Sequence, residues 1–466
     1  MHIEQIYTSC LAQGAYYITS NGEAAIIDPL REIKPYLTRI QKDGVQLKYI
    51  FETHFHADFV SGHIDLSKAT GAIIVYGPTA EASFDCITAK NEEIFIVGKI
   101  AIKVLHTPGH TMESSTFLLL DEHGKEQCIF TGDTFFLGDV GRPDLAQAAT
   151  NMTKEELAGL LYDGLMNKIM PLPDDIIVYP AHGAGSACGK NMMKETVDTL
   201  GHQKKVNYAL NQPNRDAFIK AVTDGLLPPP GYFGMNVFMN KNGYENINDV
   251  LNKSLTPFSS DEFELIIKRS EAIILDTRAN TDFYKEHIPQ SINIGLKGDF
   301  APWVGALVVD VNQPILLITD IGEEEDAIIR LSRVGFDHVI GYLKGGLKAW
   351  QDAGKLSTSI NRIESKEFSK KVNLQNDVVI DVRKPGEFIT EHLEGAYNKP
   401  LEYIYEWIKE IDPNQHFYLH CAGGYRSMSA ASILQARGIH NFSEIAGGFN
   451  EIRKTSLPIN NFVCNG

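Results

Sequence analysis

The chain has 466 residues, of which 43% are hydrophobic and 22% are charged, and this length predicts two to four domains of ordinary globular composition. The formal net charge of −16 argues against broad binding to nucleic acids or anionic membranes, although a local pocket for a small anion remains compatible with it. No stretch approaches the roughly 18 consecutive apolar residues of a membrane span, and the N-terminus lacks the pattern of a secretory signal.

The cysteines are too few and too scattered for a disulfide framework in a chain of this size. We therefore expect a reducing cytoplasm, where a special cysteine is catalytic rather than structural. The six are Cys10, Cys86, Cys128, Cys188, Cys421 and Cys464.

Residues 1 to about 250 alternate β-branched segments with helical patterns, and most of the expected strands end in a polar loop. Strands are expected at 22–30, 47–54, 71–77, 100–110, 115–122, 127–133 and 174–183. Functional side chains should therefore collect at strand ends, where loops sit on a rigid scaffold. Beyond them, 226–233 is a stiff Pro-rich break, and 255–267 is typical of a linker that runs into a capped helix.

Four motifs at these strand ends carry histidines and carboxylates, and they are "THFHAD", "HTPGHT", "FTGDTFF" and "YPAHG". Their candidate residues are His54, His56, Asp58, His110, Asp133 and His182. Imidazoles and carboxylates without cysteine suit Zn, Fe or Mn. A lone histidine is more often a core or surface residue, but four such motifs in order favour a metal centre.

These motifs resemble the metallo-β-lactamase superfamily, in particular its glyoxalase II-like branch, over residues 1 to about 250. The resemblance implies an αββα sandwich. In two-metal members the pattern is T-H-x-H-x-D-H, and the Asp and the following His carry a second ion. Here Phe59 follows Asp58 and cannot bind a metal, and His63 lies four residues too late to be assumed a substitute.

This departure points away from a dinuclear hydrolase and towards the persulfide dioxygenase branch, which uses one Fe(II) held by two His and one Asp. The resemblance then implies one Fe(II) per chain, bound by His54, His110 and Asp133, with three positions open for O2 and a persulfide. In such enzymes His56, Asp58 and His182 orient ligands or protons.

Two further residues fit a sulfur substrate, each with a plain alternative. "GDVGRPDL" is similar to the family's G-R-x-D segment, so Arg142 is a candidate clamp for the carboxylate of a thiol carrier, or else an ion-pair partner of Asp144. Cys188 follows His182 by six residues in a Gly-rich turn. It is either a persulfide carrier beside the metal or an inert buried thiol.

The remaining sequence is an internal duplication, because 272–296 matches 378–401 and 335–350 matches 438–452. Each copy spans about a hundred residues and alternates strands with helices, which predicts two small α/β domains with mainly parallel sheets. The expected domains are 1–250, 260–356 and 360–466.

The last copy contains "LHCAGGYRSMSAAS", in which a strand ends at Cys421, a glycine loop follows and a helix is expected from near Ser427. A helix N-terminus beside Arg426 stabilises a thiolate, and loop N–H groups at Gly423 and Gly424 can cradle an oxyanion or persulfide. This segment is similar to the rhodanese loop C-x-x-x-x-R, whereas a phosphatase would need one more residue before the arginine. A buried structural cysteine is the remaining alternative.

The middle copy has Asp320 at the position of Cys421, and a carboxylate cannot carry sulfane sulfur. Its loop is about two residues shorter, and four acidic residues at 323–326 would repel an anion. We expect this copy to be catalytically dead.

The whole chain resembles a fusion of a persulfide dioxygenase with one degenerate and one active rhodanese domain. The resemblance implies oxidation of a low-molecular-weight persulfide by O2 to sulfite, with Cys421 forming or using thiosulfate in sulfide detoxification, and a homodimer or homotetramer. The rival interpretations are a zinc thioester hydrolase of the glyoxalase II type with an appended sulfurtransferase, and a non-enzymatic persulfide sensor or relay.

Overall fold

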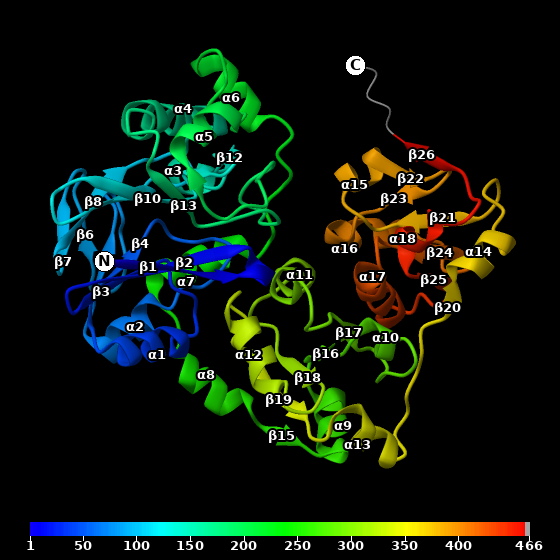
Figure 1. Cartoon of the computed structure of the whole chain (residues 1–466). Coiled ribbons are helices and arrows are strands. Elements are labelled where there is room, and N and C mark those ends of the chain that lie inside the picture. The colour runs from blue at the N-terminus through cyan, green and yellow to red at the C-terminus, as the bar shows by residue number, and fades with distance from the viewer. Residues whose placement is uncertain (462–466) are drawn as a thin grey trace. The chain divides into compact units, whose positions relative to one another are not determined.

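The computed structural model describes residues 1–461, which form two compact units (Figure 1). Unit 1 comprises residues 1–248 and 331–335, and unit 2 comprises the residues from 249 to 330 and from 336 onward. Within 1–461, none of the helices is long and apolar enough to cross a membrane. The five cysteines of this range are free thiols, and Cys464 lies outside the described residues.

Unit 1 contains two six-stranded sheets. The first has the order β1-β2-β3-β4-β5-β6, with β1 (His2–Thr8), β2 (Gln13–Ser20), β3 (Glu23–Ile27), β4 (Gln46–Glu52), β5 (Ile73–Tyr76) and β6 (Ile87–Thr88). The second has the order β14-β13-β10-β9-β8-β7, with β7 (Ile94–Val97), β8 (Ile100–His106), β9 (Ser115–Leu120), β10 (Glu126–Gly132), β13 (Ile177–Pro180) and β14 (Asp198–Thr199). A separate hairpin pairs β11 (Phe135–Phe136) with β12 (Asp139–Val140).

Helices cover the outer faces of both sheets. Those of this part of the chain are α1 (Lys34–Asp43), α2 (His63–Thr70), α3 (Gln147–Thr150), α4 (Lys154–Gly164), α5 (Leu200–Val206), α6 (Arg215–Thr223), α7 (Phe233–Asn242) and α8 (Ile247–Ser254). Residues of α1, α2 and α7 pack on the first sheet, and residues of α4, α5 and α6 pack on the second. The expected αββα sandwich is confirmed.

Strand β2 shows why the sequence forms this sandwich. Its side chains alternate between two cores, because successive residues of a strand point to opposite faces. Tyr16 and Ile18 enter the core between the sheets, whereas Ala15 and Tyr17 enter the core under the helices. Burial on both faces is accordingly found along almost the whole length of β2.

The strands that carry the four motifs deliver their ends to one edge of the sandwich. In the second sheet β10 runs parallel to β13, and β8 runs in the same direction because both β8 and β10 are antiparallel to β9. In the first sheet, β4 ends at Glu52, two residues before His54. The expected strands at 47–54 and 100–110 are therefore shorter than predicted, and His54 and His110 lie in loops.

Unit 2 contains two five-stranded sheets with equivalent orders, β15-β19-β18-β16-β17 and β20-β25-β24-β21-β23, and every neighbouring pair in them is parallel. The first contains β15 (Pro257–Phe258), β16 (Ile273–Asp276), β17 (Ile292–Asn293), β18 (Ile315–Ile318) and β19 (Val339–Leu343). The second contains β20 (Arg362–Glu364), β21 (Val378–Asp381), β23 (Tyr397–Asn398), β24 (Phe417–His420) and β25 (Phe442–Ala446). The equivalent strand orders agree with the duplication seen in the sequence.

The helices of unit 2 follow the same repeat. In the first copy they are α9 (Ser260–Arg269), α10 (Asn280–Phe283), α11 (Phe300–Leu307), α12 (Glu324–Ser332) and α13 (Gly346–Asp352). In the second they are α14 (Ser365–Lys371), α15 (Pro385–Thr390), α16 (Ile404–Trp407), α17 (Tyr425–Ala436) and α18 (Gly448–Ile452), and β22 (Glu391–Leu393) pairs with β26 (Ile459–Asn461). The predicted capped helix start is confirmed, because Ser259 and Glu262 form a capping box on α9.

Candidate functional site

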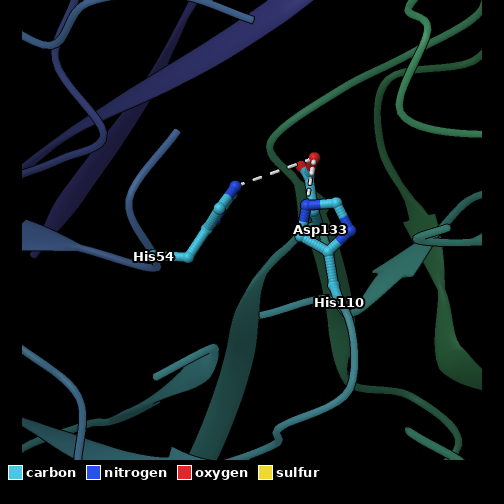
Figure 2. A group of neighbouring side chains, drawn as sticks. All are labelled: His54, His110 and Asp133. Carbon is cyan, nitrogen blue, oxygen red and sulfur yellow. Dashed lines mark ion pairs between the residues drawn. The ribbon is translucent and has the colours of Figure 1, made fainter. Parts of the chain in front are cut away.

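Three side chains of unit 1 converge on one point: His54, His110 and Asp133 (Figure 2). The Nε2 atoms of His54 and His110 lie 3.8 and 3.5 Å from Oδ2 of Asp133. Figure 2 shows both rings directed at this carboxylate from separate loops. All three side chains are buried, so solvent does not satisfy the atoms that face each other.

The donor atoms of this cluster fit a metal ion. The Nδ1 atom of His110 donates to the backbone oxygen of Arg142 at 2.9 Å, and Nδ1 of His54 lies 3.0 Å from Thr53 Oγ1. These contacts leave both Nε2 atoms for a ligand. Nε2 of His54 and Oδ2 of Asp133 have no hydrogen-bond partner among the described residues, and buried polar atoms of this kind call for one.

The charges around the cluster set the protonation states that metal binding requires. Burial would raise the pKa of Asp133, but His182, His54 and His110 hold that pKa well below its usual value. Burial and the neighbouring His56 hold the pKa of His54 well below its ordinary value. Asp133 is therefore a carboxylate and His54 a neutral imidazole.

His182 and Asp58 lie next to this cluster and contact each other. Nδ1 of His182 lies 2.7 Å from Oδ1 of Asp133, and its Nε2 lies 2.7 Å from Oδ2 of Asp58. Burial would lower the pKa of His182, but the two carboxylates raise it well above its usual value. Phe59 is fully buried and packs its ring 4.3 Å from that of His56, so its role is packing rather than metal binding.

Cys188 lies beside Asp58 and His182. Its sulfur and one donor atom of each of these two residues all lie within 4.8 Å of one another. Cys188 is 1% exposed. Burial, together with Asp58 and Asp133, raises the pKa of its thiol well above the usual value. The protonated, buried thiol is closer to the inert alternative than to a reactive carrier.

His56 points away from the three-residue cluster and into a buried network with two carboxylates. Its Nε2 lies 3.1 Å from Asp28 Oδ1 and 3.3 Å from Glu52 Oε2. Burial would lower the pKa of His56, but Asp28 and Glu52 raise it to about 10. His63, which the sequence left unexplained, places Nδ1 3.4 Å from Glu52 Oε1 at the start of α2.

Sequence reasoning missed three residues of this network: Asp28, Glu52 and Thr53. Thr53 donates from its backbone N and its hydroxyl to the two oxygens of Asp28, at 2.8 Å each. The signal for them was present, since Asp28 follows β3 and Glu52 ends β4, at the same kind of strand end that revealed the histidines.

Arg142 forms the ion pair that was one of its two predicted roles. Its Nε and Nη2 donate to the two oxygens of Asp144 at 2.7 and 2.8 Å, and Nη1 and Nη2 also reach backbone oxygens of Ala187 and Leu227. The side chain is 6% exposed. Because these partners engage its donors, the geometry does not support the carboxylate clamp, and Arg142 contributes its backbone oxygen to His110 instead.

In unit 2, Cys421 follows β24 directly and lies buried in its loop. The N–H of Gly424 donates to its sulfur at 3.1 Å, as expected of a cradling loop. The helix α17 begins at Tyr425 rather than near Ser427, because Gly424 adopts a φ of 104° and turns the chain early. Gly423 lies in the same loop, and no hydrogen bond from it to the sulfur is found among the described residues.

Arg426 lies at the first turn of α17 and pairs with Glu387 of α15. Its Nη1 and Nη2 lie 2.6 and 2.8 Å from the two oxygens of Glu387. Burial would raise the pKa of Glu387, but Arg426 lowers it. This ion pair compensates part of the charge of Arg426.

The corresponding place in the first copy is an open pocket of about 510 Å³. Asp320 lies in its lining together with Arg278, Lys285 and Lys348. The helix that follows begins with Glu324, Glu325 and Asp326. This pocket therefore lacks a sulfur nucleophile, and its lining combines Asp320, Asp282 and Glu286 with the three cationic side chains.

Comparisons with known proteins match three segments of the chain. A model described as the metallo-beta-lactamase superfamily matches residues 10–182, and a rhodanese-like domain matches twice, at 259–353 and 364–455. The crystal structure of a metallo-beta-lactamase from Staphylococcus aureus subsp. aureus COL is similar, with a TM-score of 0.65 and 31% identity, over 74% of this chain and 98% of that one.

Two curated relatives carry different names at nearly equal identity. The persulfide dioxygenase ETHE1, mitochondrial, of Homo sapiens is 30% identical over 210 residues, which cover 45% of this chain and 74% of the human protein. The probable hydroxyacylglutathione hydrolase glo2 of Schizosaccharomyces pombe is 32% identical over 174 residues, which cover 36% of this chain and 62% of that protein. The chain thus spans less than two thirds of the yeast protein, and identity alone does not separate the two activities.

Proposed function

The chain belongs to the metallo-beta-lactamase superfamily and carries two rhodanese-like domains later in its sequence. From this premise we propose that it is an iron-dependent persulfide dioxygenase coupled to a sulfurtransferase. Unit 1 oxidises a low-molecular-weight persulfide to sulfite with O2. The second rhodanese copy transfers sulfane sulfur through Cys421, forming or using thiosulfate, and the pair serves sulfide detoxification.

The observation that carries this proposal is the donor set of one buried three-residue group. His54, His110 and Asp133 offer two imidazoles and a carboxylate, the ligand set of mononuclear non-haem iron oxygenases. A second ion would need ligands at Asp58 and at the next residue, but that residue is Phe59, and Asp58 Oδ2 already lies 2.7 Å from His182 Nε2.

The side chains around the site have separable tasks in this proposal. A bound Fe(II) would supply the chemistry that activates O2 and oxidises the sulfane sulfur. His182 holds Oδ1 of Asp133, so that Oδ2 faces the two histidines. The backbone oxygen of Arg142 orients the His110 ring through Nδ1. Their common effect is a rigid, buried donor set.

In unit 2 the proposed nucleophile is the Cys421 thiolate. It attacks the outer sulfur of a persulfide, the S–S bond breaks, and the thiol carrier leaves with the bonding electrons. The resulting cysteine persulfide then passes its outer sulfur to sulfite and gives thiosulfate. The same site can run this exchange from thiosulfate to a persulfide.

A zinc-dependent thioester hydrolase of the glyoxalase II type with an appended sulfurtransferase is the second candidate. The hydrolase relative is as similar as the dioxygenase, and Asp58, His182 and Cys188 form a further group that could hold an ion. This candidate requires that the contact between His182 and Asp58 open to admit a metal.

Metal analysis of protein purified without oxygen, coupled to oxygen uptake, separates the two. We expect about one iron per chain and oxygen consumption with glutathione persulfide that yields sulfite. Two zinc ions per chain, or hydrolysis of a glutathione thioester without oxygen uptake, would establish the hydrolase instead.

The division of labour between the units has its own test. Cys421→Ser should abolish sulfur transfer between thiosulfate and a thiol while oxygen uptake stays within about twofold, because the two sites use separate chemistry. Loss of both activities in this variant, with an intact melting profile, would contradict the division.

The predicted homodimer or homotetramer stays a proposal that sedimentation analysis can check.

A further inference from the structure

Behind Cys421 a short chain of hydrogen bonds runs from the loop into the core of unit 2. Ser427 Oγ lies 3.5 Å from the sulfur of Cys421 and 2.7 Å from Oε1 of Glu444. All three side chains are at most 1% exposed, so water does not compete for these contacts. Ser427 has a single hydroxyl proton and donates to only one of its two neighbours at a time.

The carboxylate at the end of this chain is held by an arginine. Arg362 and Glu444 are direct neighbours across β20 and β25, and Arg362 Nε lies 3.0 Å from Glu444 Oε2. The guanidinium also stacks over the Tyr284 ring, 4.6 Å from its centroid. Arg362 therefore fixes one oxygen of Glu444, while the other faces Ser427.

The duplication provides an internal comparison between residues that keep the fold and residues that accompany the cysteine. The buried pairs Asp276–Arg278 and Asp381–Arg383 occur in both copies with the same bidentate geometry. A pair found equally in the copy without a cysteine serves the fold.

The chain behind Cys421 behaves differently. Where the second copy pairs Arg362 with Glu444, the first pairs Pro257 with Tyr342 at the same register. Gly335 follows α12 and Gly438 follows α17. When these two glycines are aligned, Glu324 falls at the position of Ser427. The copy that lacks the cysteine therefore lacks every member of the chain behind it.

We propose that Ser427 and Glu444 form a proton path for Cys421, in which Glu444 is a positioning residue that stores the thiol proton and Arg362 holds Glu444 in place. This inference deepens the sulfur-transfer half of the proposed function and rests on it.

The step balances with water as the only further reactant. The thiol proton of Cys421 passes to Ser427 Oγ while the proton of Ser427 passes to Glu444 Oε1. Ser427 is unchanged, Cys421 becomes a thiolate and Glu444 a neutral acid. When the thiolate breaks the S–S bond of a persulfide R–S–SH, the leaving RS⁻ takes a proton from water and departs as RSH, while Cys421 becomes Cys–S–SH. When the outer sulfur later passes to sulfite, the Cys421 thiolate is released and recovers the stored proton from Glu444 through Ser427.

The electrostatics of Glu444 suit a store of this kind. Burial raises its pKa to about 7, although Arg362 and Ser427 act to lower it. From β20, Glu364 also faces it and acts in the raising direction. The charge of Arg426 also acts on Cys421, and Arg426 in turn forms an ion pair with Glu387 of α15. A carboxyl that titrates near neutrality can take up and return a proton at working pH.

The test uses the full chain and follows Cys421 across pH. Alkylation of Cys421 by iodoacetamide, quantified on its peptide by mass spectrometry, and sulfur transfer from thiosulfate to cyanide are measured from pH 5.5 to 10. In Glu444→Gln and in Ser427→Ala we expect both rates to fall about tenfold or more near pH 6.5 and to return to within about twofold above pH 9, where a thiol ionises unaided.

The controls separate a proton path from a structural role. Ser427→Thr keeps the hydroxyl and should restore the wild-type profile. Glu367→Gln on α14 removes an exposed carboxylate that pairs with Lys371 and should leave the profile unchanged. Ser427→Ala leaves the Glu444–Arg362 pair intact, so it decides the question if Glu444→Gln fails to fold.

Two results would overturn the path: unshifted profiles in both variants, or a loss of the same factor at every pH. Failure of the proposed function looks different, since in that case Cys421→Ser would keep its sulfur transfer. If Cys421→Ser is inactive and the other two variants match the wild type, only the proton path is wrong.

Discussion

At the residue scale, the candidate metal cluster is supported by side chains that are not among its three donors. Thr53 links His54 to Asp28, because its hydroxyl lies 3.0 Å from His54 Nδ1 and 2.8 Å from Asp28 Oδ2. A carboxylate that acts on a histidine through a hydroxyl fixes the ring and makes it a better ligand. His182 fixes the orientation of Asp133 through the contact between its Nδ1 and Oδ1 of Asp133.

This arrangement predicts the effect of removing the Thr53 hydroxyl. Thr53→Val keeps the shape of the side chain but leaves His54 Nδ1 and Asp28 Oδ2 without this partner, so metal affinity should fall about 10- to 100-fold. Competition with a chelator during anaerobic titration measures that affinity. Thr53→Ser, which retains the hydroxyl, is the matched control, and equal affinity in both variants would exclude the role given to Thr53.

At the element scale, the register of parallel strands decides which residues meet. β25 lies between β20 and β24, and this places Glu444 beside Arg362 on one side and Leu419 on the other. Helix α17, which follows the Cys421 loop, then brings Ser427 next to Glu444. The residues behind Cys421 therefore come from three elements: Arg362 from β20, Glu444 from β25 and Ser427 from α17.

The burial of Glu444 predicts a pH dependence of stability. Its folded pKa of about 7 lies above the usual 4.5, so the folded state binds its proton more tightly than the unfolded chain. The free energy of unfolding should therefore decrease between about pH 4.5 and 7, by roughly 3 kcal/mol in total, and level out above that range.

Thermal unfolding of the wild type and of Glu444→Gln between pH 4.5 and 8 checks this sign. The neutral variant should lose less stability as pH rises, so the difference in melting temperature should move in its favour. Parallel curves for the two proteins would show that Glu444 keeps an ordinary pKa in the folded state.

At the scale of the whole molecule, the copy without a cysteine contacts the helix that follows Cys421 within unit 2. Tyr425 of the cysteine loop donates to the backbone oxygen of Gly295 at 2.7 Å, and Gln435 of the same helix lies 2.7 Å from His287 Nε2. The serine Ser432 accepts from the backbone of Asn293 at 2.9 Å. Helix α17 is thus anchored along its length by a domain that has no cysteine of its own.

Tyr425→Phe removes one of these anchors without touching the sulfur. A hydrogen bond of this kind contributes about 0.5 to 1.5 kcal/mol, so sulfur transfer should fall about two- to tenfold while oxygen uptake is unchanged. Steady-state rates of both activities provide the measurement. Tyr397→Phe, at a tyrosine that is 58% exposed, should leave both rates as they are.

The sequence alone determined the order of the motifs, the strand ends at which they lie, the duplication and the loss of the cysteine in one copy. These features depend on local periodicity and on self-similarity, which can be seen without coordinates. The same rule would have found Asp28 and Glu52, had it been applied to acidic residues as strictly as to histidines.

The tertiary structure decided which donors meet and which are engaged elsewhere. It directed His54, His110 and Asp133 at one point, turned His56 to Asp28 and bound the guanidinium of Arg142 to Asp144. A strand-end rule gives the edge of a sheet at which a side chain lies, but its direction depends on packing between residues far apart in the sequence. For the same reason Glu444 gave no signal in the sequence, since only the register of β20, β25 and β24 brings it behind Cys421.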